Sequence, residues 1–196
     1  MKQGFNIDTP EFTQADVVLV TGVSAKTLQN WTDPSRSILR LSQGNVGKGR
    51  RRLYSPLDMM ALTLITQLGV LGISPNVVSR LFYDEGSSVS EWFQLAARNL
   101  SREHICRVYL GENGLCAELV SSQEQNNKYV YEQDNGPPRG YAFVQATLTS
   151  VAKFVLYGVA KMSIEQTPDR ALSARDNTIF EIREELRAMK MKEQQA

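Results

Sequence analysis

The chain has 196 residues, of which 42% are hydrophobic, and it carries 22 Lys and Arg against 21 Asp and Glu. This length suggests one larger domain or two small ones, and the apolar fraction is sufficient for a core. Two cysteines exclude a disulfide framework and fit a reducing compartment. The N-terminal sequence MKQGFNIDTPEF lacks the apolar stretch of a secretory signal. We therefore expect a cytoplasmic protein.

The positive charge is concentrated between residues 26 and 52. Seven lysines and arginines lie there against one acidic residue, Asp33, which gives a local charge of +6. They are Lys26, Arg36, Arg40, Lys48, Arg50, Arg51 and Arg52. Such a cluster attracts polyanions at short range even when the whole chain is nearly neutral. An ordinary solvated loop is the alternative interpretation, but the helices predicted on either side favour a binding surface.

The segment that leads into the basic region has the pattern of a helix-turn-helix. Gly22 lies where a tight turn needs a positive φ, and Ser24 follows as a good N-cap for the helix AKTLQNW. With Gly22 as the turn, the predicted interior side chains are Val17, Val23, Leu28 and Trp31. The predicted outward side chains are Lys26, Thr27, Gln29 and Asn30. These groups can read base edges, because Asn and Gln suit adenine and Lys suits guanine.

A second pair of helices is predicted after the basic region. Ser55 as N-cap, Pro56 in the first turn and Asp58 near the positive helix end predict the first start. The apolar stripe of this helix consists of Leu57, Met60, Leu64, Leu68 and Leu71. Ser74 and Pro75 repeat the same start for a shorter helix.

The charge-free stretch between Met59 and Ser79 is long enough to span a bilayer. Polar, glycine and proline residues interrupt it at Gln67, Gly69, Gly72, Pro75 and Asn76. We therefore expect two buried helices of a soluble protein, the first ending at Gly72, and no membrane partner.

The middle of the chain changes character. EWFQLAARNL predicts a helix over 91–100, and HICRVYL and LCAELVS, separated by GENG, predict a β-hairpin. If Leu110 pairs with Leu115, Arg107 meets Glu118, an opposite-charge pair that supports this register. On the other face, Val108 then meets Ala117 and Cys106 meets Leu119. Because this register places the two cysteines on opposite faces, we expect no disulfide.

The segment from 141 to 162 fits two structures. A helical stripe is formed by Val144, Leu148, Val151, Val155, Val159 and Met162, with Gln145, Thr149, Lys153 and Lys161 away from it. Period-two alternation fits nearly as well from Phe143 to Lys153, but length and alanine content favour the helix. A short strand is predicted at 129–131. The last segment predicts a heptad-like helix that docks on its own chain or pairs with another copy.

We expect neither a metal site nor an enzyme. His104, Cys106 and Cys116 match no common zinc spacing, and the single histidine has no acid–base partners nearby. No GxGxxG or P-loop motif is present, and adjacent acidic residues such as Glu184 and Glu185 point apart. The aromatic side chains after residue 90 are more typical of a core than of a ligand cavity. No cofactor is expected.

Several motifs of residues 12–82 occur together in one known family. Phe12-Thr13 precedes a helix, and Thr21-Gly22-Val23-Ser24 is followed by Lys26-Thr27-Leu28. A basic segment with Gly49, Arg52 and Tyr54 comes next, then Asp58 and Gly72-Ile73-Ser74. This region resembles the N-terminal domain of MerR-type (mercury-resistance-like) transcription regulators.

The resemblance implies a winged helix-turn-helix with residues 24–31 as the recognition helix. Lys26 takes the basic recognition position, and Arg52 and Tyr54 take the wing positions that grip backbone phosphate. An arginine fork suits phosphate and fixes register without reading sequence. The expected DNA-binding residues are Ser24, Lys26, Thr27, Gln29, Asn30, Lys48, Arg50, Arg51, Arg52 and Tyr54.

The overall prediction is a mostly helical α+β protein in three parts. Residues 1–85 form the winged helix-turn-helix, 86–170 a small regulatory or dimerisation domain with a β-hairpin, and 171–196 a C-terminal helix. The expected function is a sequence-specific transcription regulator that binds a palindromic DNA operator as a homodimer, with RNA polymerase or a recombinase as a further partner. An architectural or recombination-directing protein of a mobile element is the first alternative, and a protein–protein interaction module the second.

Overall fold

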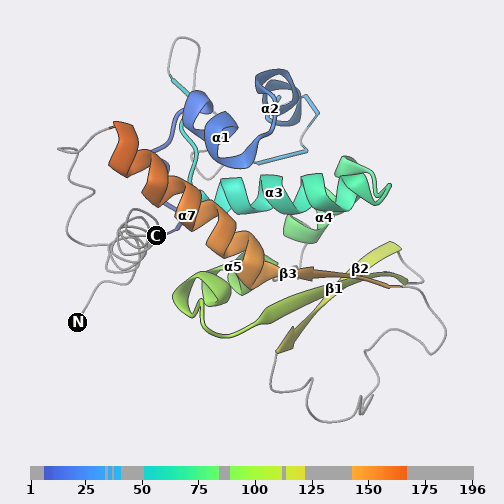
Figure 1. The fold of residues 1–196 in the computed structure, drawn as a ribbon. Helices are drawn as coiled ribbons and strands as arrows, with labels where there is room; N and C mark the ends of the chain where they lie inside the picture. The colour runs from blue at the N-terminus through green and yellow to red at the C-terminus, as the bar shows by residue number, and fades with distance from the viewer. Residues whose placement is uncertain are drawn as a thin grey trace.

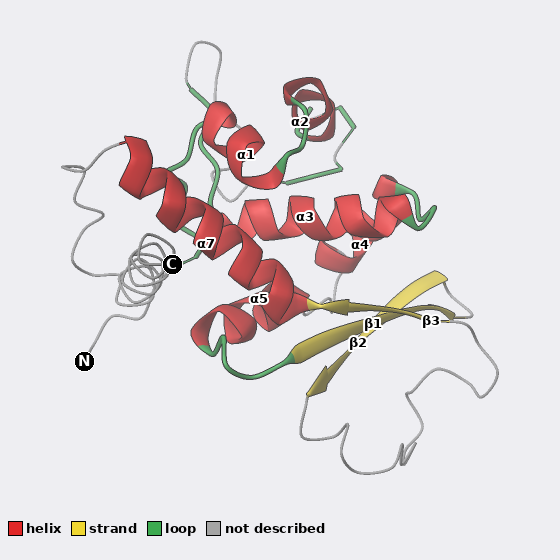
Figure 2. Ribbon diagram, viewed as in Figure 1, coloured by secondary structure: helices red, strands yellow, loops and turns green. Residues whose placement is uncertain are grey.

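The computed structural model describes residues 7–33, 35–36, 38–40, 51–83, 89–111, 114–121 and 143–166 of the chain. These residues form an α+β fold with six helices and one three-stranded antiparallel sheet. Figure 1 shows the helices gathered at one end of the molecule and the sheet at the other. Figure 2 shows the same view by type of secondary structure. The predicted α+β class is confirmed.

Helices α1 (Gln14–Thr21) and α2 (Ala25–Trp31) begin and end where local chemistry dictates. The backbone N–H of Thr13 donates to the Asp16 carboxylate at 2.7 Å, one half of a capping box. Gly22 ends α1 with a φ of 70° in the left-handed region, as predicted. Ser24 caps α2, because its Oγ accepts from the Thr27 N–H at 3.1 Å.

Helix α3 (Pro56–Val70) is the central helix of the fold. Its predicted N-cap is confirmed, since Ser55 Oγ accepts from the Asp58 N–H at 3.1 Å. The predicted single stripe is too narrow, because Met59, Leu62 and Ile65 are also completely buried. Leu71, predicted in the stripe, lies beyond the helix and is 62% exposed. A helix enclosed on nearly all sides does not show the one-sided pattern on which that prediction rested.

Helices α4 (Pro75–Tyr83) and α5 (Val89–Arg98) complete the helical end, and both were predicted. The carbonyl of Ser74 accepts from the Val78 N–H at 3.0 Å and so opens the first turn of α4. The rings of Phe82 and Phe93 stack with centroids 6.1 Å apart, which joins the two helices.

The sheet consists of β1 (His104–Gly111), β2 (Gly114–Ser121) and β3 (Phe143–Thr147) in the order β2-β1-β3. The predicted hairpin register is confirmed at every pair, including Leu110 with Leu115. Both cysteines are free thiols, in agreement with the expectation of no disulfide.

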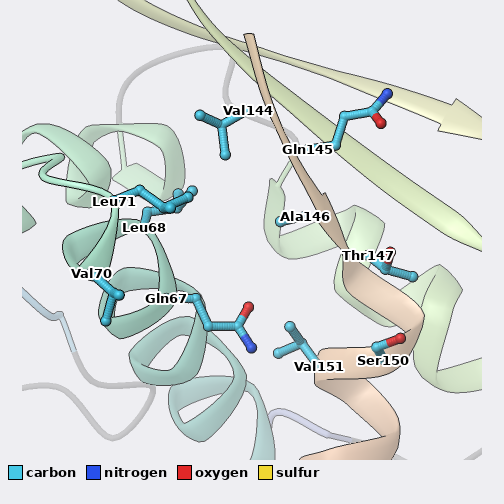
Figure 3. Close-up of a pocket in the computed structure, with 10 residues that line it drawn as sticks. All are labelled: Gln67, Leu68, Val70, Leu71, Val144, Gln145, Ala146, Thr147, Ser150 and Val151. Carbon is cyan, nitrogen blue, oxygen red and sulfur yellow. The ribbon is translucent and has the colours of Figure 1, made fainter.

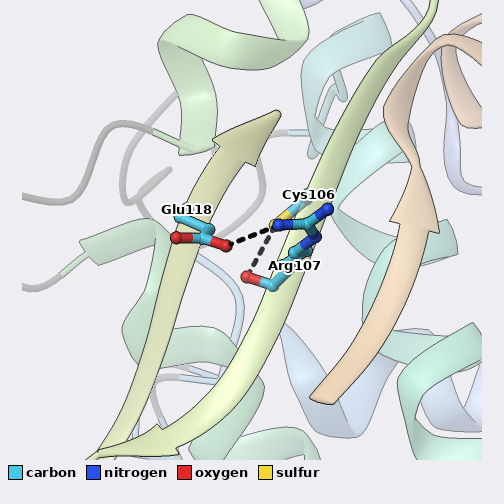
Figure 4. A network of polar contacts seen from close by, with 3 residues as sticks. All are labelled: Cys106, Arg107 and Glu118. Atoms are coloured by element: carbon cyan, nitrogen blue, oxygen red, sulfur yellow. Dashed lines mark hydrogen bonds and ion pairs between the residues drawn. The ribbon is translucent and has the colours of Figure 1, made fainter. Parts of the chain in front are cut away.

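A partly buried ion pair crosses the hairpin. Arg107 Nη1 lies 3.3 Å from Glu118 Oε1, as the predicted opposite-charge pair requires (Figure 4). The neighbouring Cys106 Sγ donates a weak hydrogen bond to the carbonyl of Arg107 at 3.9 Å. Cys106 itself is completely buried in the core shared with the helices.

The segment from 143 onwards is a strand followed by a helix, α7 (Leu148–Gln166). The predicted single helix is therefore wrong for residues 143–147, where pairing with β1 outweighs helix propensity. From Leu148 the predicted helix is confirmed. Thr149, predicted to lie away from the apolar stripe, is nevertheless buried. Its Oγ1 accepts from the His104 N–H at 2.9 Å, so the buried hydroxyl has a polar partner.

One hydrophobic core spans the described helices and the sheet. It contains buried residues from both sides of the predicted boundary at residue 85, including Val17, Leu64, Phe93 and Val155. That boundary stays a prediction, as does the C-terminal helix over 171–196, which lies outside the described residues together with the strand at 129–131. Within the described part of the chain, no helix is long and apolar enough to cross a membrane.

Candidate nucleic-acid interface

Helix α2 is held to the body of the protein by its inner face. Leu28 is completely buried, as is Val17 of α1, and Val23 in the turn between them is 6% exposed. Trp31, the fourth predicted interior residue, is only partly buried. A seven-residue helix is too short to be stable alone, so this packing and the Ser24 cap fix its orientation.

The outer face of α2 carries polar side chains that point to solvent. Ser24, Lys26 and Gln29 are exposed, while Thr27 and Asn30 are half-buried. The hydroxyls of Ser24 and Thr27 lie 2.8 Å apart and hydrogen bond to each other. Lys26 and Gln29 are therefore the predicted recognition residues whose side chains are most accessible to a partner.

Arg52 links the segment after the basic region to the end of α2. Its Nη1 donates to the Thr32 hydroxyl at 2.7 Å and to the Thr32 carbonyl at 3.1 Å. Thr32 caps α2, and its hydroxyl donates in turn to the Leu28 carbonyl at 2.8 Å. Part of the guanidinium is thus committed to holding α2, a role that the sequence pattern did not reveal.

Tyr54 is a core residue and not a surface contact. Its side chain is 1% exposed, and its backbone forms a short antiparallel bridge with Phe12, with N···O distances of 2.8 and 3.0 Å. Burial raises the pKa of the Tyr54 hydroxyl, although hydrogen bonding with Thr32 and the nearby Arg52 charge oppose the shift. A side chain enclosed in this way offers no surface to phosphate, so we remove Tyr54 from the candidate interface.

Arg51 is the exposed cation of this region among the predicted wing residues that the structure describes. Lys48 and Arg50 lie outside the described residues. Arg51 and Arg52 line a shallow groove of about 670 Å³ together with residues of α1 and the first residue of α2. We call it the α1–α2 groove; its other lining residues are Gln14, Ala15, Val18, Leu19 and Ala25.

Leu19 is a further candidate interface residue that the sequence pattern did not single out. It is 60% exposed and lies in the α1–α2 groove. The signal was present, because four consecutive apolar residues, 17–20, cannot all face inward from one helix. An exposed leucine beside α2 can offer an apolar contact of the kind that a thymine methyl group accepts.

The single histidine and one of the two cysteines are buried in the described part of the fold. His104 is buried, with Nδ1 3.2 Å from the Arg102 carbonyl. Burial, and secondarily the Glu118 charge, raises the pKa of the Cys106 thiol to about 12, so it is protonated at neutral pH. The described residues contain no group of three or more His, Cys, Asp or Glu that could hold a metal ion.

Comparison with protein-family models and with curated proteins gives no guide to this interface. The chain matches no protein-family model, and no curated protein matches it. The likeness of residues 12–82 to MerR-type regulators therefore rests on the motifs alone.

Proposed function

We propose that this protein binds double-stranded DNA through α2 and is a sequence-specific transcription regulator with a winged helix-turn-helix of the MerR type. The observation that supports the proposal best is the two-sided character of α2. Leu28 on the inner face of α2 is completely buried, whereas Lys26 and Gln29 on the outer face are exposed. A short rigid helix with an exposed polar face is what major-groove reading requires.

In this proposal, base reading and phosphate binding belong to different residues. Gln29 can donate to and accept from the edge of adenine, and Lys26 can donate to guanine. Arg51 beside the α1–α2 groove supplies a sequence-independent contact to backbone phosphate. Arg52 acts chiefly as a positioning residue, because it fixes the end of α2 through Thr32.

The partners follow from the proposed reading mode. A two-fold dimer places two recognition helices on one face of the duplex and reads a palindromic operator. Access to chromosomal DNA and two free cysteines both fit a cytoplasmic protein. RNA polymerase is the partner expected of a regulator, and a recombinase is the partner expected of the architectural alternative.

Selection from a pool of random DNA duplexes tests the proposal. Bound duplexes are recovered at low salt, amplified and sequenced over several rounds. A regulator enriches a two-fold-symmetric motif, whereas an architectural protein enriches flexible steps such as TA without a fixed motif. Absence of duplex binding at low salt would exclude both and leave the protein–protein interaction module.

A further inference from the structure

A second groove lies between the end of α3 and strand β3 (Figure 3). It has a volume of about 450 Å³ and is lined by residues of both elements and by Ser150 and Val151 of α7. Four consecutive residues of β3, 144–147, take part. Because successive strand side chains point to opposite faces, such a groove must run along the edge of the strand. We call it the α3–β3 groove.

The outer edge of β3 is open within the described residues. Strand order β2-β1-β3 places β3 at the edge of the sheet, and no described strand pairs with its other side. An open edge presents backbone N–H and C=O groups that can pair with a further strand. Directly beside it, Val70 is 82% and Leu71 62% exposed. Adjacent exposed apolar residues next to an open edge are typical of an interaction site.

The composition of this groove favours a second copy of the same chain as the partner. None of the ten described residues that line it carries a charge. Near a two-fold axis each side chain lies close to the same side chain of the other copy. Charged lining residues would therefore repel one another across the axis, and the uncharged residues of this groove do not. Each copy also offers the same uncharged groove, whose exposed residues Val70 and Leu71 can pack against those of another copy.

Gln145 suits the centre of such a contact. In Figure 3 its side chain points away from α3, while Val144 and Ala146 point towards it. A glutamine amide both donates and accepts, so it can hydrogen bond to the same residue of another copy. Antiparallel pairing is the arrangement that a two-fold axis imposes on two copies of one strand.

We infer that the chain forms a two-fold dimer in which β3 pairs antiparallel with β3 of a second copy. The pairing is centred near Gln145 and joins two three-stranded sheets into one of six strands. Val70 and Leu71, which line the α3–β3 groove of each copy, pack against the other copy. This assembly does not depend on the proposed DNA binding, because its residues lie on different elements from α2.

Sedimentation equilibrium of the full chain over a concentration series tests the inference. The wild-type chain has the mass of two chains at high concentration, and the double variant Val70→Lys/Leu71→Lys has the mass of one. Both substituted side chains are exposed, so the fold tolerates them, and the thermal unfolding curve verifies this. The control is Leu95→Lys, a 46% exposed leucine of α5 outside the groove, which keeps the two-chain mass. A wild-type chain of single-chain mass throughout, or a double variant that still dimerises, would overturn the proposal.

Chemical cross-linking tests the position of the axis. In a Cys116→Ser background, which removes the half-buried native thiol, Gln145→Cys is treated with a short bis-maleimide. The proposed pairing brings the two introduced thiols together, so a covalent dimer forms rapidly. Leu95→Cys in the same background is the control for random collisions. Equal cross-linking rates of the two variants would contradict a two-fold axis near Gln145.

Discussion

Two consecutive arginines, Arg51 and Arg52, have different surroundings and therefore different expected effects. Arg51 is exposed at the rim of the α1–α2 groove, whereas Arg52 is half-buried and hydrogen bonded to Thr32. A free guanidinium contributes to DNA affinity through counterion release, while an engaged one contributes to the folded structure first. The two residues thus form a matched pair that separates binding from stability.

Arg51→Ala should weaken DNA binding for all sequences alike. Loss of one phosphate contact should reduce the slope of log affinity against log salt by about one unit. Gln29→Ala, which changes no charge, should leave that slope unchanged and instead alter the selected motif, at a cost of about 1–3 kcal/mol at one base pair. Fluorescence anisotropy at several salt concentrations measures both. Identical behaviour of the two variants would contradict the proposed division between base reading and phosphate binding.

Arg52→Ala should lower the free energy of unfolding by about 1–2 kcal/mol, because the charged hydrogen bonds to the α2 cap are lost. Arg51→Ala should change it by less than about 0.5 kcal/mol, as is usual for exposed positions. Urea denaturation followed by circular dichroism compares them. If both variants unfold at the same urea concentration as the wild type, Arg52 does not fix α2.

The buried thiol of Cys106 predicts a specific pH dependence of stability. Burial holds its pKa at about 12 in the folded state, against 9.0 for a free thiol. Since the folded state retains the proton that the unfolded chain loses, this contribution is complete below pH 9 and is lost as pH rises from 9 towards 12. The wild type should therefore lose stability in this window faster than Cys106→Ala, by up to about 1.4 kcal/mol per pH unit. Parallel pH profiles of the two proteins would show that the thiol ionises freely when folded.

At the scale of elements, helices α1 and α7 cross closely at Gly158. Among the described glycines whose surroundings are known, Gly158 lies nearest to a side chain of another helix. A Cβ placed on Gly158 of α7 would lie 2.8 Å from Cγ1 of Val20 in α1. Contacts this short do not occur in well-packed proteins, so the absent side chain is what lets the two helices approach. The predicted helix-turn-helix is thereby anchored on a helix from the far end of the chain.

Gly158→Ala should therefore destabilise the fold by about 1–3 kcal/mol, because the added methyl overpacks the crossing. Helix propensity alone would give the opposite sign, since alanine is favoured over glycine by about 1 kcal/mol. Gly69→Ala is the matched control, because nothing lies within 4 Å of its Cβ position in α3, and it should stabilise. Denaturant unfolding measures both, and Val20→Ala should restore part of the loss in the double variant. A stabilising Gly158→Ala would show that α1 and α7 separate easily.

The accuracy of the sequence predictions follows the range of the interactions involved. The N-caps at Ser24 and Ser55, the positive φ of Gly22 and the hairpin register all depend on residues close in sequence, and all are confirmed. Strand β3 depends on β1, about forty residues away, and could not be separated from helix by periodicity. Likewise, the burial of Tyr54 depends on pairing with Phe12, which no local pattern reveals.

At the scale of the whole molecule, α7 connects the two proposed surfaces. It begins at the α3–β3 groove with Ser150 and Val151 and crosses α1 at Gly158, eight residues or roughly 12 Å further along the helix. In the proposed dimer, this helix would fix the separation of the two proposed recognition helices. The two proposals together therefore predict that the fold sets the spacing of the half-sites in the operator.

Dimer-dependent DNA binding is the prediction that tests this arrangement. Val70→Lys/Leu71→Lys should bind an isolated half-site like the wild type but should lose the steep, cooperative binding of the full palindrome. Lys26→Ala should show the reverse, with the two-chain mass retained and the preferred half-site altered. Gel-shift titrations on half-site and full-site duplexes distinguish the two variants. Cooperative binding by the Val70→Lys/Leu71→Lys variant would place the dimer contact elsewhere and would leave the proposed DNA recognition by α2 unaffected. An unaltered half-site preference in Lys26→Ala would instead count against Lys26 as a base-reading residue and would leave the proposed dimer unaffected.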